Sequence, residues 1–129
     1  MRAVFSFLIS AAWLLTSAPA LSHHSFAAEF DINRPIELTG TVTRVELTNP
    51  HAWLFIDTED GDGNVQSWAI ELLGINALIR RGWTRDRVNP GDVVSVEGFG
   101  ARDGTNTGNA SVVTMTNTGE LLWESATEE

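Results

Sequence analysis

The chain contains no cysteine and no lysine, and all eight of its basic residues are arginine. Without cysteine it can form no disulfide, carry no lipid-anchoring thiol and build no structural zinc site of the usual cysteine-containing kind. Without lysine it has no Gly-x-x-x-x-Gly-Lys phosphate loop, and no serine lies in a Gly-x-Ser-x-Gly elbow. Since no catalytic motif is present, we do not expect an enzyme.

Positive charge is also scarce, with eight basic residues against seventeen acidic ones. The formal net charge is −9, so the chain repels the phosphate backbone of nucleic acid. We therefore expect no nucleic-acid partner. The five tryptophans and six phenylalanines instead indicate a packed core, and they argue against a disordered chain.

The N-terminus has the pattern of an export leader. Arg2 supplies a positive charge, residues 3–15 are mostly apolar, and residues 16–20 are small or proline. The apolar run is shorter than the roughly 20 residues that span a bilayer. We predict a Sec-type signal peptide over residues 1–22, cut after Ala20 or after Ser22, and hence a periplasmic protein with no membrane attachment once the leader is removed.

Cutting the 129-residue chain at these points leaves 109 or 107 residues, the size of one domain. Apolar residues alternate with polar ones over 36–47, with a change of phase between Val42 and Val45 that suggests a bulge or a sharp bend, for which Gly40 is a plausible companion. Short apolar or β-branched runs predict four further strands, over residues 52–56, 65–72, 93–99 and 110–115. Residues 121–123 could add a last short pairing segment.

One helix is predicted between the third and fourth strands. Ile75, Leu78 and Ile79 have helical spacing, and Gly82 stands where such a helix would end. The fold class is therefore mainly β, a five-stranded OB-like barrel over 36–123. An extended arm over 23–35 precedes the barrel, and an acidic tail over 124–129 follows it.

Several segments of the chain form a recognisable set. The most specific are His23-His24-Ser25-Phe26 and Asn49-Pro50-His51-Ala52-Trp53. The others are Glu29-Phe30-Asp31, Leu38-Thr39-Gly40-Thr41-Val42, Trp68-Ala69-Ile70-Glu71 and Gly91-Asp92. In these segments the chain resembles a family of small exported bacterial proteins known as domain of unknown function 6152. The resemblance implies an exported, leader-bearing, OB-like domain, and it implies no established activity.

The three histidines are the candidate metal ligands. His23 and His24 fall at the predicted mature N-terminus, and His51 lies just before a strand. If His23 is the first residue, its amine and ring can chelate one metal; if it is the third, the amine, two amides and the imidazole form a square-planar copper or nickel site. Glu29 and Asp31 are candidates to orient a ring, or are plain solvated charge.

We therefore predict a non-enzymatic binding module for a late transition metal, copper first, with His23, His24 and His51 as ligands. The alternative is a metal-free protein-interaction or envelope stress module that uses the barrel loops and an aromatic face. Trp53 and Trp68 are the weaker candidates for ligand contacts on that face, and the competing interpretation places them in the core. An oxidative copper enzyme is a further alternative, which would need an open coordination position.

Overall fold

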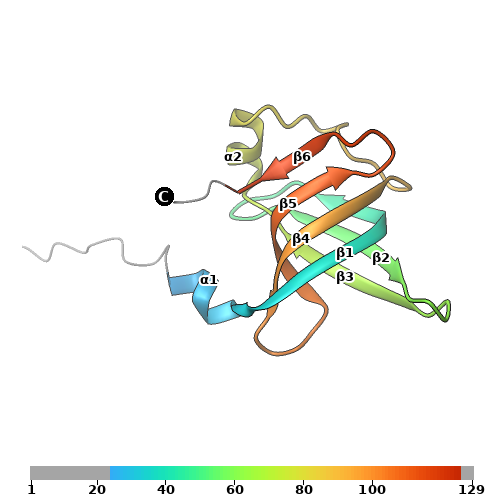
Figure 1. Cartoon of the computed structure of the whole chain (residues 1–129). Helices are drawn as coiled ribbons and strands as arrows, with labels where there is room; N and C mark the ends of the chain where they lie inside the picture. The colour runs from blue at the N-terminus through green and yellow to red at the C-terminus, as the bar shows by residue number, and fades with distance from the viewer. Residues whose placement is uncertain (1–23, 126–129) are drawn as a thin grey trace, which may run out of the picture.

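The computed structural model describes residues 24–125, which form a mainly β domain with two short helices (Figure 1). The predicted leader, its cleavage site and most of the acidic tail lie outside these residues. The helices are α1 (His24–Glu29) and α2 (Ile75–Arg80). The strands are β1 (Phe30–Glu46), β2 (Trp53–Glu59), β3 (Val65–Glu71), β4 (Val93–Ala101), β5 (Thr107–Met115) and β6 (Leu121–Glu124).

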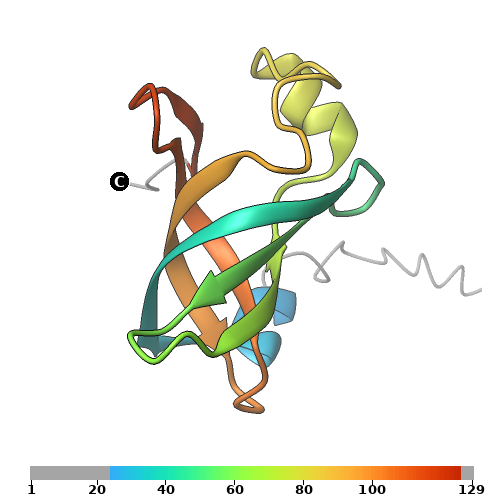
Figure 2. The ribbon, with the colours of Figure 1, turned by 90° about the vertical axis from the view of Figure 1, so that its right-hand side faces the viewer.

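The six strands form one sheet in the order β3-β2-β1-β4-β5-β6. Neighbours in this order are antiparallel. In addition, β3 pairs in parallel with β5, from Ala69↔Thr107 to Glu71↔Asn109. The pairings therefore run from β3 through β2, β1, β4 and β5 and back to β3, and the strands wrap around a common interior (Figure 2).

The core consists of the alternate residues that each strand turns inward. Leu54 and Ile56 of β2, and Val94 and Val96 of β4, are fully buried, whereas the residues between them are partly or fully exposed. This is the period-two pattern of a strand with one buried face. The predicted strands around these residues are thus confirmed.

The first strand bends where the sequence changes phase. Its register against β2 shifts between Val42 and Arg44, which confirms the predicted bulge. At Gly40, a Cβ atom would lie 2.7 Å from the carbonyl oxygen of Asp57, so a side chain there would obstruct the pairing. The bend allows β1 to pair with β4 over its first part and with β2 over its second.

The prediction of an extended arm over 23–35 is wrong for residues 24–29, whereas residues 30–35 are extended and belong to the first strand. Residues His24–Glu29 form α1, and β1 begins at Phe30. Two alanines and a glutamate favour a helix, and the Phe26 ring packs 5.6 Å from that of Phe30 and 6.1 Å from that of Phe99, between ring centroids. The contact with Phe99 is tertiary, so the local pattern could not reveal it.

The C-terminal half follows the predicted order more closely. Helix α2 lies between β3 and β4, and Gly82, with φ of 89°, comes directly after the C-cap Arg81. The segment predicted to pair after β5 is β6, which buries Trp123. Within residues 24–125, no helix is long and apolar enough to cross a membrane.

We predict that Gly98→Ala destabilises the domain. A Cβ at Gly98 would overlap the backbone carbonyl of Asn109, because β4 and β5 approach closely there. Such overpacking costs about 1–3 kcal/mol, and each kcal/mol lowers Tm by about 4–8 °C in a domain of this size. Gly61→Ala is the matched control, since nothing lies within 4 Å of its Cβ position. Equal melting temperatures for the two variants would contradict the close approach.

Candidate functional site

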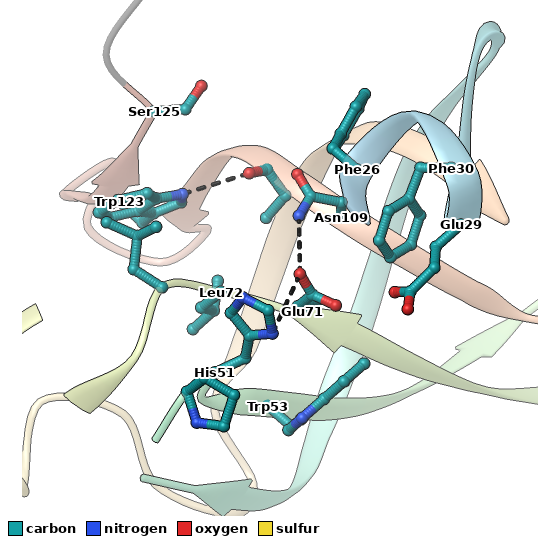
Figure 3. Close-up of a pocket in the computed structure, with 13 residues that line it drawn as sticks. Phe26, Glu29, Phe30, His51, Trp53, Glu71, Leu72, Asn109, Trp123 and Ser125 are labelled. Carbon is teal, nitrogen blue, oxygen red and sulfur yellow. Dashed lines mark hydrogen bonds and ion pairs between the residues drawn. The ribbon is translucent and has the colours of Figure 1, made fainter. Parts of the chain in front are cut away.

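A cavity of about 510 Å³ lies beside α1, at the ends of β2 and β3 (Figure 3). Its volume is in the range of small-ligand sites. The side chains come from segments far apart in the sequence: α1, the turn before β2, the end of β3, β5 and β6. The lining residues used below are Phe26, Glu29, Phe30, His51, Trp53, Glu71, Asn109 and Trp123.

Backbone pairing fixes the position of His51 at the cavity. The next residue, Ala52, donates its N–H to the carbonyl of Leu73 at 3.0 Å and accepts the N–H of Leu72 at 2.9 Å. The Thr48 hydroxyl donates to the His51 carbonyl at 2.8 Å. At Gly74, a Cβ would lie 2.5 Å from the Pro50 carbonyl oxygen, so the chain before His51 packs directly on a glycine.

Glu71 is the buried charged group of the cavity. The residue is 6% exposed, although it carries a carboxylate. Its Oε1 lies 3.6 Å from Nδ1 of His51, and the side-chain amide of Asn109 donates to the same oxygen at 3.3 Å. Figure 3 shows the two contacts converging on this one oxygen. The last β3–β5 pair, Glu71↔Asn109, brings the amide to the carboxylate.

The surroundings of Glu71 oppose its ionisation. Burial raises the pKa of the Glu71 carboxyl above its ordinary value of 4.5. The charge of His51 lowers this pKa, the carboxylate of Glu29 raises it, and the hydrogen bond from Asn109 lowers it again, with a net upward shift. A cation in the cavity would favour the ionised carboxylate.

The remaining lining favours a cationic ligand. Phe26, Phe30, Trp53 and Trp123 form aromatic walls, and Glu29 adds a second carboxylate. Among the described residues, no arginine lines this cavity. Its polar side chains include one imidazole, two carboxylates and one amide.

The structure brings some of the predicted site residues together. His51 and Trp53 line the cavity, and so does Glu29, one of the two carboxylates predicted near the histidine pair. His24 is the first residue of α1, whose later residues line the same cavity. His23 and the side chain of His24 lie outside what the structure describes.

Trp53 and Trp68 do not share a surface. Trp68 is 8% exposed and belongs to the core cluster, opposite Ile56 in the β2–β3 ladder. Trp53 is half-buried on the other face, at the cavity. Asp31 does not line the cavity; its carboxylate accepts the N–H of Asn33.

The sequence interpretation missed Glu71 and Asn109. One signal was available for Glu71, an acidic residue inside the otherwise apolar run Trp68-Ala69-Ile70-Glu71-Leu72-Leu73. Asn109 gave none, because it lies in a segment rich in glycine, asparagine and threonine that reads as a loop. Within residues 24–125, no three histidine, aspartate or glutamate side chains form a ready metal-binding group.

The chain belongs to a family of unknown function, DUF6152, whose model matches residues 12–110. The matched range includes α1, His51 and both Glu71 and Asn109. No curated protein matches the chain.

We predict that Glu71→Gln stabilises the protein relative to the wild type increasingly as the pH rises. The pKa of Glu71 is higher in the folded protein than in the unfolded chain. The wild type therefore has its full free energy of unfolding below the unfolded-state pKa and loses part of it as the pH rises through the folded-state pKa. Glutamine stays neutral throughout. Urea unfolding of both proteins at about pH 4 and about pH 7 measures the difference.

The matched control for this experiment is Glu97→Gln, which removes an exposed carboxylate on β4 with the same change of charge. The free energy of unfolding relative to the wild type should rise more between acid and neutral pH for Glu71→Gln than for the control. If the stability of Glu71→Gln relative to the wild type does not change or falls with rising pH, burial does not control the pKa of Glu71.

Proposed function

We propose that this chain is an exported periplasmic binding domain with an OB-like barrel, and that it binds a late transition metal, copper first, at the cavity beside α1. The ligands are His51 and the N-terminal histidines His23 and His24. The observation that carries the proposal is the position of α1, which begins at the second histidine of the pair and lines the cavity that also contains His51.

Helix geometry supports a short path from the N-terminus to the cavity. Glu29 lines the cavity, and His24 precedes it by five residues in the same helix. At 1.5 Å per residue, the two backbones are separated by about 7.5 Å along the axis. His23 is the next residue. This short separation is what the proposal requires if the N-terminal histidines are to reach the cavity.

The chemistry of the donors suits copper. Imidazole and amine nitrogens bind copper, nickel and zinc. Because Nδ1 of His51 faces Glu71, the Nε2 atom of the same ring is left to bind a metal. A carboxylate on the other ring nitrogen orients such a ligand and raises its basicity. Glu71 is thus an orienting partner, and its negative charge is favoured by a bound cation.

The strand pairings support the OB-like barrel. Five strands pair in a ring in the order β1, β2, β3, β5, β4, and α2 lies between β3 and β4. The closing contact is the three-residue pairing of β3 with β5, which covers part of the sheet edge that β3 would otherwise expose. The sixth strand pairs only with β5.

The test begins with the intact mass of the secreted protein, which identifies its first residue. Cu(II) is then titrated into this mature protein and followed by absorbance and EPR, for the wild type, His23→Ala and His51→Ala. We expect submicromolar binding by the wild type. Loss of either ligand should weaken it by at least about tenfold, since even orienting partners contribute 10- to 100-fold.

The matched control is Gln66→Ala, an exposed polar residue of β3 in the β2–β3 hairpin and not among the cavity residues. It should bind like the wild type. Micromolar or weaker Cu(II) binding that neither histidine substitution changes would rule out the metal site. Capture of a periplasmic partner by the same metal-free protein would then favour an interaction module.

A further inference from the structure

The cavity beside α1 has a wall in which three strands place side chains in one row. Trp53 of β2 is directly opposite Glu71 of β3, and Glu71 is paired with Asn109 of β5. The strand neighbours Leu54 and Ile70 belong to the core, so the row lies on the face of the sheet that is turned away from it. Side chains opposite each other on one face are in contact range. The row therefore sets an indole, a carboxylate and an amide side by side in the cavity wall.

The carboxylate of this row offers one oxygen to a ligand. The Glu71 side chain is only 8% exposed. Its described contacts, with His51 and with Asn109, both meet Oε1. In Figure 3 the other oxygen, Oε2, points away from both partners, to the side of the cavity where Glu29 is drawn. A buried carboxylate oxygen is stabilised by a hydrogen-bond donor, so Oε2 is the place where a donor on a ligand would bind.

Aromatic rings form much of the remaining lining. Phe26 and Phe30 lie with their ring centroids 5.6 Å apart, and Trp53 and Trp123 line the same cavity. The indole N–H of Trp123 already donates to the carbonyl of Ala110 at 3.3 Å. Aromatic faces attract a cation through their quadrupole, and they also pack against carbon chains. This lining suits a ligand that has a charged group on an apolar body.

Charge and volume narrow the class of ligand further. The carboxylate of Glu29 lies close enough to raise the pKa of Glu71, so two acidic groups act on one part of the cavity and favour a cation there. The volume of about 510 Å³ is that of a site for an organic molecule. Because Oε2 accepts a hydrogen bond, the cation should carry an N–H donor.

We propose that the cavity binds a small organic amine in its protonated form, with the ammonium group donating to Oε2 of Glu71 and the carbon chain packed against the aromatic lining. The ammonium group also gains from the charge of Glu29. A quaternary ammonium ion lacks the donor, and an alcohol lacks the charge, so each makes only part of these interactions. The site consists of described residues alone and does not rest on metal binding.

The experiment titrates three probes into the metal-free mature protein by isothermal calorimetry: n-butylammonium, tetramethylammonium and 1-butanol. It is run at about pH 7.5, where an alkylamine is protonated. Salt at about 0.15 M screens general attraction to the acidic surface. We expect saturable binding of one n-butylammonium ion, about tenfold or more tighter than that of 1-butanol, because a charge-assisted hydrogen bond is lost with the alcohol. Tetramethylammonium should also bind more weakly than n-butylammonium.

Variants of two residues test the carboxylate and the ring separately. Glu71→Gln keeps the shape of the side chain and removes its charge, so it should weaken n-butylammonium binding by about tenfold or more. Glu97→Gln, which removes an exposed carboxylate on β4, is the matched control and should bind like the wild type. Trp53→Leu should weaken binding by about threefold, and Trp53→Phe, which keeps an aromatic face, should restore it.

The side-chain amide of Asn109 reports where the amine binds. Because it donates to the Glu71 carboxylate, its NMR signals should shift as n-butylammonium is added. The proposal is overturned if n-butylammonium does not saturate the protein, if the alcohol or the quaternary ion binds equally well, or if Glu97→Gln weakens binding as much as Glu71→Gln does. These titrations contain no metal. Amine binding without Cu(II) binding would therefore contradict only the proposed function, and Cu(II) binding without amine binding would contradict only this inference.

Discussion

The parallel pairing of β3 with β5 is the contact on which the fold and the candidate site both depend. It joins the two ends of the series β3-β2-β1-β4-β5, so that the inward faces of all five strands enclose one core. Gly108, opposite Ile70 in this pairing, has no side chain, and a Cβ there would overlap Ile36. The same pairing ends at Glu71↔Asn109, and both of these residues line the cavity.

Burial of one carboxylate gives this cavity its chemical character. A charged group removed from water costs free energy unless it gains partners, and the partners of Glu71 among residues 24–125 are one amide and one half-exposed imidazole. The nearby Glu29 carboxylate adds to the cost. A cation beside the carboxylate would offset this cost, as the charge of His51 does in part.

The N-terminal helix connects this cavity to the most unusual part of the sequence. His23 and His24 would be an ordinary polar pair on a free arm. In the structure residues His24–Glu29 are helical, Arg102 and Phe26 hold them against the sheet, and Phe26 and Glu29 line the cavity. The contacts that hold α1 come from β4, the residue after it and the start of β1.

Local chemistry in the sequence determined the strands, the bulge near Gly40 and α2 with its terminal Gly82, because apolar period, glycine placement and turn residues act over a few neighbouring positions. The sequence also pointed to His51, but not to its partners. Only the tertiary structure decided that α1 is a helix and that Asn109, 38 residues from Glu71, meets the same carboxylate oxygen that His51 faces. The contact at Glu71 depends on the pairing of β3 with β5, and the helix depends on the packing of Phe26 against Phe99. Neither contact can be predicted from neighbouring residues in the sequence.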